Sequence, residues 1–239
     1  MTEYAPYQGG AFSPPPAHAG PVRPLRNHAW IAMGALGIIG LEALVAAALL
    51  AYLFAAEAAA TEPTSEQLAL QTFLYEREQG VAAALLVVAG IAFVGWLHRA
   101  RTNLDGRDGP ELTWKRGWTV GGWLVPLGNL VIPQLVVGEV DRVSEEWADE
   151  SEGRPHERHR GVLTLWVVLW SLHLVAGRFA DNAPTELDPG PATLLGVAWG
   201  LFQAVTAGSA VLLVWQITAH QERARIALAR LAQAPAAQC

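Results

Sequence analysis

The sequence predicts an all-α, polytopic membrane protein, because its apolar residues are concentrated in long runs. Hydrophobic residues make up 52% of the 239 residues and charged residues 16%, against ~25% charged in soluble domains. Four runs are nearly free of charge and close to the ~20 residues that a helix needs to cross a hydrocarbon core. We therefore expect transmembrane helices at about 29–56, 80–98, 161–178 and 191–218.

The first run follows a tail rich in Pro, Gly and Tyr at residues 1–28. Such a composition buries too little apolar surface to offset the entropy of ordering, so we predict a disordered cytoplasmic tail. The run itself is too long and starts too late for a signal peptide, whose apolar region has ~7–15 residues near the N-terminus. We therefore interpret it as a retained helix, the first of a membrane domain over residues 29–218. Residues 219–239 are predicted to form a cytoplasmic helix and tail.

A further apolar segment, 117–137, differs in kind because Gly and Pro interrupt it. Pro126 should break a helix at Val125, since the residue before proline avoids the α region. Asn129 could then cap a new helix with Pro133 in its first turn. We predict that this broken segment is re-entrant or lies at the cytoplasmic interface, and that it packs against the other helices.

An amphipathic helix is predicted over 133–149, because apolar residues recur there at helical spacing. They are Val136, Val140, Val143 and Trp147. The apolar face of this helix could lie on the membrane surface or against the bundle. Acidic and basic residues fill the other side: Glu139, Asp141, Arg142, Glu145, Glu146 and Asp149.

The distribution of basic residues favours four crossings with both termini in the cytoplasm. If segment 117–137 does not cross, the inside segments hold 2, 5, 4 and 3 of the 16 Lys and Arg residues, 14 in all. If it crosses, the split becomes 7 inside against 8 outside. Five crossings is the alternative.

Several classes of function are excluded or disfavoured. A formal net charge of −6 argues against nucleic-acid binding, and the lone Cys239 excludes a disulfide scaffold. His156, Glu157 and His159 spell HExH rather than the HExxH of zinc enzymes. Without a phosphate loop or a nucleophile–base pair in the sequence, we expect no enzyme activity, cofactor or metal.

Abundant Ala with Lys115 as the single lysine suggests a high-GC bacterial source.

Three of the polar residues within the apolar runs are candidate sites: Glu42, His173 and Gln203. Glu42 is near the centre of the first run, where a charge costs roughly 2.5–3.5 kcal/mol on insertion scales and where desolvation favours the neutral acid. It is either a proton or cation site or the partner of Gln203, at matching depth, in an interhelical hydrogen bond. His173 shares a face with Trp166 and Trp170, and is either a pH-responsive group or a structural histidine.

Two other patterns have two interpretations each. Arg99, Arg101 and Asn103, with Lys115 and Arg116, form a cytoplasmic basic rim that could bind anionic lipid headgroups or a partner, or make interhelical hydrogen bonds. Residues Gly196, Gly200, Ala204 and Gly208 form a small-residue stripe for helix packing, within one chain or in a homo-oligomer. The sequence favours interfacial anchors over a ligand cage for the tryptophans near the third segment, Trp114, Trp118 and Trp123.

The stretch from Phe93 to Ser144 resembles the bacterial domain-of-unknown-function 4328 family of integral membrane proteins. An ordered series of residues supports the resemblance: Phe93, Trp96, Leu97, Arg99, Ala100, Arg101, Asn103, Gly117, Trp118, Gly121, Trp123, Val125, Pro126, Asn129, Leu130, Pro133, Val137, Glu139 and Ser144. The resemblance implies about four helices over roughly 29–232 and no activity, substrate or cofactor.

The sequence therefore favours a non-enzymatic accessory or scaffold component of a bacterial cytoplasmic membrane, in contact with the lipid bilayer and with either anionic lipid headgroups or a membrane protein partner. The alternative is a small transporter, channel-like or lipid-binding protein that uses Glu42 and the broken segment, since interrupted helices at membrane depth often line binding sites.

Overall fold

The computed structural model describes residues 23–59, 65–105, 112–125, 128–180 and 189–233, and these residues are predominantly helical. The helices are α1 (Arg26–Ala59), α2 (Ser65–Asn103), α3 (Trp118–Leu124), the single 3₁₀ turn η1 (Gly128–Leu130), α4 (Ile132–Glu152), α5 (Gly161–Ala180) and α6 (Pro189–Gln233). Most of the predicted disordered tail lies outside the described residues, but its last three residues begin α1.

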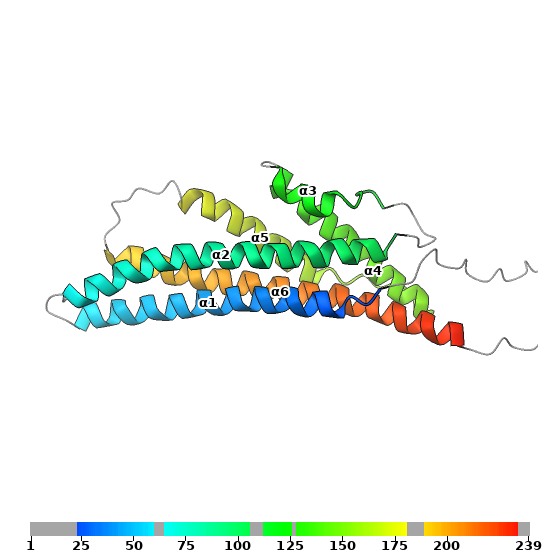
Figure 1. Ribbon diagram of the computed structural model, residues 1–239, viewed down its shortest axis with the longest axis horizontal. Helices are drawn as coiled ribbons and strands as arrows, with labels where there is room; N and C mark the ends of the chain where they lie inside the picture. The colour runs from blue at the N-terminus through cyan, green and yellow to red at the C-terminus, as the bar shows by residue number, and fades with distance from the viewer. Residues whose placement is uncertain (1–22, 60–64, 106–111, 126–127, 181–188, 234–239) are drawn as a thin grey trace, which may run out of the picture.

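Three long helices, α1, α2 and α6, run side by side along the molecule (Figure 1). Four segments are long and apolar enough to cross a membrane: Arg26–Ala56 of α1, Gly80–Asn103 of α2, Gly161–Arg178 of α5 and Thr193–Gln233 of α6. These are the four helices that the sequence predicts. The helices α2 and α6 are also longer than their apolar runs, because each continues without a break into a polar extension.

Helices α1 and α6 form the most extensive contact of the bundle. Their backbones approach closely at Gly200, where an added Cβ would lie 2.8 Å from the carbonyl oxygen of Ala43. An added Cβ at Gly196 would meet the side chain of Leu50, whereas a Cβ at Gly208 would meet nothing within 4 Å. The stripe therefore packs helices within the chain at Gly196 and Gly200, and Gly208 stands outside that contact.

The broken segment is built as two helices that meet at a bend of 117°. Helix α3 ends at Leu124 and Val125 is extended, with φ −82° and ψ 116°, which confirms the predicted break. Pro133 lies in the first turn of α4, also as predicted. The expected cap was wrong: Asn129 lies in η1, and Val131 takes the N-cap position without a side-chain hydrogen bond. The 3₁₀ turn delays the start of α4 and so carries Asn129 out of the capping position.

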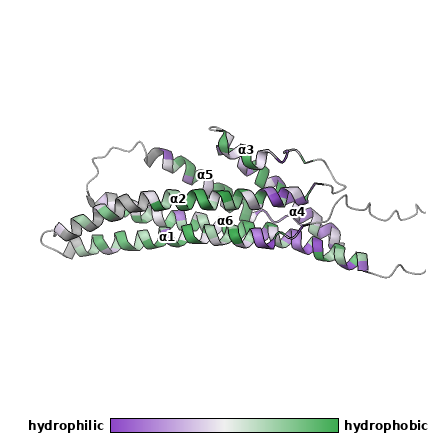
Figure 2. Cartoon of the chain, in the orientation of Figure 1, coloured by the Kyte–Doolittle hydropathy of each residue, from purple (hydrophilic) through white to green (hydrophobic). Residues whose placement is uncertain are grey.

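The amphipathic helix is present as α4, and residues of both its apolar and its polar side are buried. Val136, Val140, Val143 and Trp147 are buried, and so are four acidic residues of the opposite side. Burial is possible because these carboxylates accept hydrogen bonds from other segments. Figure 2 shows the hydrophilic end of α4 beside the hydrophilic end of α6, and we call this part of the molecule the polar end. Its buried acids are Glu139, Asp141, Glu145 and Asp149.

Candidate functional site: a polar cavity among apolar helices

A cavity of about 230 Å³ lies between helices α2 and α5 and is partly open to the surroundings. Helices α1 and α6 also line it, and α3 contributes one side chain. The opening follows from the packing, because α2 packs mainly on α1 whereas α5 packs mainly on α6. The C-terminal end of α5 lies visibly apart from α2 in Figure 1. The walls are largely apolar, and the larger or polar members are Leu36, Ile39, Glu42, Leu86, Phe93, Val94, Trp123, Trp166, Trp170, His173, Gln203 and Thr206.

The structure brings together the three polar residues that the sequence singled out within the apolar runs. Glu42 from α1, His173 from α5 and Gln203 from α6 all line this cavity. The hydrogen bond expected between Glu42 and Gln203 is absent, and neither side chain has a hydrogen-bond partner in the described part of the chain. Two polar groups within apolar helices are therefore left to face a cavity rather than each other.

An aromatic ladder forms one wall of the cavity. Trp166, Trp170 and His173 follow one another along a face of α5, as their spacing predicts, with ring centroids 6.2 and 5.9 Å apart and nearly parallel planes. Phe93 of α2 extends the ladder, stacking on Trp166 at 6.1 Å. Trp123 of α3 packs edge-on against both Phe93 and Trp170, at 5.7 and 5.8 Å. Trp123 thus belongs to the cavity wall, although the sequence suggested an interfacial anchor.

Three ring nitrogens of this wall are buried without a hydrogen-bond partner among the described residues. They are Nε1 of Trp123, Nε1 of Trp170 and Nδ1 of His173. Buried polar side-chain atoms are hydrogen-bonded in the large majority of cases, so their grouping in one wall distinguishes this region from ordinary helix packing. Glu42 and His173 are the titratable side chains of the lining, and no Lys or Arg of the described chain lines the cavity.

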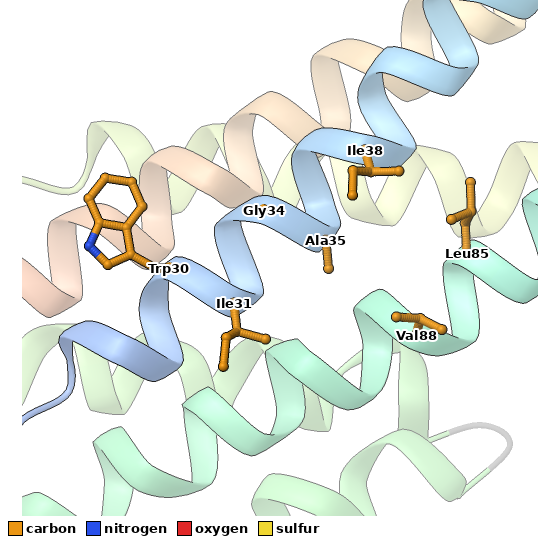
Figure 3. Close-up of a pocket in the computed structure, with 7 residues that line it drawn as sticks. All are labelled: Trp30, Ile31, Gly34, Ala35, Ile38, Leu85 and Val88. Atoms are coloured by element: carbon orange, nitrogen blue, oxygen red, sulfur yellow. The ribbon is translucent and has the colours of Figure 1, made fainter.

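A second hollow lies on the outside of the bundle between α1 and α2 and has a different character (Figure 3). Its volume is about 330 Å³, and no side chain in its lining is charged. The residues are Trp30, Ile31, Gly34, Ala35, Ile38, Leu85 and Val88. Such a groove offers contact area, and the indole N–H of Trp30 is the one side-chain hydrogen-bond donor in its described lining.

Residues of the predicted basic rim are largely engaged in bonds within the chain. Nε and Nη2 of Arg101 donate to the carbonyl oxygen of Trp114 at 3.1 and 2.7 Å, and Nη1 pairs with Asp105. Nδ2 of Asn103 donates to Oε1 of Gln221 at 3.1 Å and to the carbonyl oxygen of Arg23 at 3.0 Å. These bonds support the interpretation of Asn103 as an interhelical tie to α6, whereas Arg101 holds the segment before α3 to the end of α2.

Other predicted residues lie near this network. Arg99 is half-buried and its Nε has no partner among the described residues. Trp118 is 37% exposed and meets the ring of Trp114 edge-on at 5.7 Å. Pro126 lies outside the described residues. Asn129 buries its Oδ1 without a described partner.

The buried acids of α4 are residues whose role sequence reasoning missed. Glu139 accepts the backbone N–H groups of Thr113 and Trp114 at 2.7 and 3.1 Å, and thereby fixes the segment that leads into α3. Asp141 accepts from Nε2 of Gln216 at 3.0 Å. Burial raises the pKa of Asp141 to about 6. The available signal for a structural role of Glu139 was its place in the ordered series of residues that carries the family resemblance.

A comparison with protein-family models matches residues 59–219 to the family described as Domain of unknown function (DUF4328). The chain belongs to DUF4328. The match spans well over half of the chain and confirms the family suggested by the motif residues. No curated protein and no solved structure matches the chain. In this DUF4328 protein, His173 and Gln203 fall within the matched range, whereas Glu42 precedes it.

The HExH motif of this DUF4328 protein ties the connection between α4 and α5 to the buried acids. Nδ1 of His156 lies 3.2 Å from Oδ2 of Asp149, and Nδ1 of His159 lies 3.3 Å from Oε1 of Glu145. Among the described residues, no group of three or more His, Cys, Asp and Glu is arranged to hold a metal ion. The two histidines thus pair separately, each with one carboxylate.

Proposed function

We propose that this DUF4328 protein is a multi-pass membrane protein that binds a small amphipathic molecule in the cavity between α2 and α5. The observation that supports the proposal most strongly is the convergence of Glu42, His173 and Gln203 on one aromatic-lined cavity. Ligand sites are typically apolar concavities with a few polar groups that fix orientation. The cavity has this composition, and the outer groove between α1 and α2 does not.

The position of the opening favours a ligand that comes from the bilayer. Helices α2 and α5 both contain apolar segments of membrane-spanning length, so an opening between them would face lipid. An amphipathic molecule could enter there by lateral diffusion, with its apolar part in contact with the exposed side chain of Leu86. A wholly polar solute would instead have to cross hydrocarbon to reach Glu42, at high cost.

We propose that both termini lie in the cytoplasm of a bacterial cell. The supporting observation is that 14 of the 16 Lys and Arg residues fall in segments that four crossings would place on one side. The same arrangement places the polar end in the cytoplasm.

We propose binding or carriage of the ligand rather than enzymatic conversion. The described lining offers no pairing of a nucleophile with a base: Glu42 and His173 are not hydrogen-bonded to each other or to a hydroxyl group. An accessory role remains the second candidate, because α6 extends beyond the bundle and exposes the apolar side chains of Ile226 and Leu231 at the polar end.

The experiment compares two glycine substitutions on the same helix. Gly90 lines the cavity and Gly95 does not, yet both are exposed and an added Cβ would meet nothing within 4 Å at either position. Gly90→Leu should therefore fill the cavity, while Gly95→Leu adds the same side chain elsewhere on α2. The full chain is extracted into polymer nanodiscs, and small molecules that co-purify are identified by native and denaturing mass spectrometry.

The proposal expects a reproducible small molecule, near one per chain, in the wild type and in Gly95→Leu. Its occupancy should fall at least severalfold in Gly90→Leu. Equal occupancy in both variants would contradict the assignment to this cavity. A protein partner that is retained by both variants, without any bound small molecule, would favour the accessory role.

A further inference from the structure

We propose that the ligand of the cavity between α2 and α5 is an amphipathic organic cation, such as a quaternary or protonated amine that bears an apolar tail. This inference rests on the binding function proposed above and narrows it to one chemical class. It follows from the charges of the lining, from its aromatic side chains and from the size of the cavity.

The charges of the lining disfavour an anion. Glu42 is the acidic side chain of the described lining, and neither Lys nor Arg accompanies it. An ionised Glu42 would repel an anionic head strongly in surroundings of low dielectric constant, and a protonated Glu42 would offer it no positive charge. A cation would instead pair with the carboxylate of Glu42, and such pairing offsets the desolvation cost of a buried charge.

The aromatic wall adds attraction for a cation. Trp123, Trp166 and Trp170 line the same cavity as Glu42, together with Phe93. Aromatic rings attract cations within about 6 Å of the ring centroid, most strongly for Trp, and clusters of such rings bind quaternary ammonium groups. The ring centroids in this wall lie 5.7 to 6.2 Å from their neighbours, so one head group could contact several rings.

The size of the cavity separates the head of the ligand from its tail. A volume of about 230 Å³ is below the ~300–1,000 Å³ of sites that enclose drug-sized molecules. The cavity can therefore take a compact head group, and the tail leaves through the opening between α2 and α5. Amphipathic cations have this shape.

Cation binding is linked to the ionisation of Glu42. The groups that line the cavity with Glu42 are His173 from α5 and Gln203 from α6, while α2 and α3 contribute apolar or indole side chains. If Glu42 is protonated before binding, the carboxylic acid releases its proton to solvent as the carboxylate pairs with the cation. Binding should then strengthen as pH rises, until Glu42 is fully ionised.

The test uses three dansyl-hexylamide compounds that differ only in the terminal group: trimethylammonium, the uncharged tert-butyl group of the same shape, and sulfonate. Binding to the full chain in uncharged maltoside micelles is followed by energy transfer from tryptophan to dansyl. Empty micelles give the background. Gly90→Leu and Gly95→Leu show which part of the signal comes from this cavity.

The wild type should bind the trimethylammonium compound about tenfold or more tightly than the tert-butyl compound, and the sulfonate least. Glu42→Gln should reduce this preference to about threefold or less, and an unchanged Tm shows that the variant is folded. Trp170→Leu provides a second variant, which keeps Glu42 and should lower the preference by a smaller factor. If binding of the trimethylammonium compound no longer depends on pH in Glu42→Gln, the pH dependence of the wild type is due to the carboxyl group of Glu42.

Two failures can be told apart. If all three heads bind equally, or the sulfonate binds best, and the signal is lost in Gly90→Leu alone, the cation assignment is overturned while the binding site stands. If none of the compounds binds above background, or Gly90→Leu changes nothing, both the cation assignment and the proposed function are contradicted.

Discussion

The close contact of α1 with α6 makes a quantitative prediction at Gly200. In Gly200→Ala the new Cβ would lie 2.8 Å from the carbonyl oxygen of Ala43 and 3.0 Å from Cβ of Ala47. Favourable contacts are ~3.3–3.6 Å for carbon to carbonyl oxygen and ~3.5–4.0 Å between carbon atoms. The helices must therefore separate by about 0.5 Å or strain locally, because the nearer obstacle is backbone that no side-chain rotation can move.

Gly208→Ala is the matched control, on the same helix and in the same stripe. A Cβ at Gly208 meets nothing within 4 Å, so this variant gains helix propensity of up to about 1 kcal/mol without a steric cost. Gly200→Ala gains the same propensity but is destabilised by overpacking, typically by ~1–3 kcal/mol. The difference in stability between the two variants should therefore be about 1–3 kcal/mol.

The assay is the apparent Tm in one detergent at one scan rate, followed by tryptophan fluorescence. At ~2–4 °C per kcal/mol for a chain of this size, Gly200→Ala should unfold roughly 2–12 °C below Gly208→Ala. Equal Tm values, or a more stable Gly200→Ala, would refute the inferred approach of α6 to α1.

Three further predictions concern the polar end and the topology. Gln221 donates to the carbonyl oxygen of Ala100 and to Oγ of Ser144 at 3.0 and 2.9 Å and is 2% exposed, so Gln221→Leu should lower stability by about 1–3 kcal/mol, measured as a fall in Tm. Asp141 binds its proton more tightly in the folded chain, where its pKa is about 6 against the ordinary 3.8. The stability contributed by this bound proton is complete below pH ~4 and is lost as pH rises through about 6. Asp141→Asn, whose amide oxygen can still accept from Gln216, should remove this loss and be more stable at pH 7 by up to roughly 3 kcal/mol; a Tm that falls between pH 4 and 7 as steeply as in the wild type would argue against it. With both termini cytoplasmic, Cys239 should resist an impermeant maleimide in intact cells and react after permeabilisation, whereas labelling of intact cells would favour five crossings.

Much of the fold could be predicted because membrane-spanning length and local backbone rules are properties of short stretches of sequence. Apolar runs located the four long helices, and the proline rule located the break at Val125. Helical spacing also placed Trp166, Trp170 and His173 on one face of α5. Matching depth in two helices was enough to suggest that Glu42 and Gln203 lie at one level.

What could not be predicted depends on partners that are distant in the sequence. The acids of α4 have the pattern of a solvated face, and only the folded chain brings Gln216 to Asp141 and the backbone of Thr113 to Glu139. Similarly, the closeness of α3 and α4 depends on Gly122, where an added Cβ would lie 2.8 Å from Cγ2 of Ile132. That packing carries Trp123 to the cavity wall rather than to an interfacial position.

The central claim, that the cavity between α2 and α5 is a ligand site, can be tested most directly with two neighbouring cysteines. In a Cys239→Ser background, Ala83→Cys lies in the cavity lining and Ala84→Cys lies on α2 outside it, and both alanines are exposed. Thiols react as thiolates, which apolar surroundings disfavour, so the rate of reaction with a small uncharged methanethiosulfonate that enters the bilayer reports how polar the surroundings of each thiol are. Our account predicts that Ala83→Cys reacts faster than Ala84→Cys and is protected by the trimethylammonium or tert-butyl dansyl compound. Equal rates at the two positions, with no protection by either compound, would contradict it.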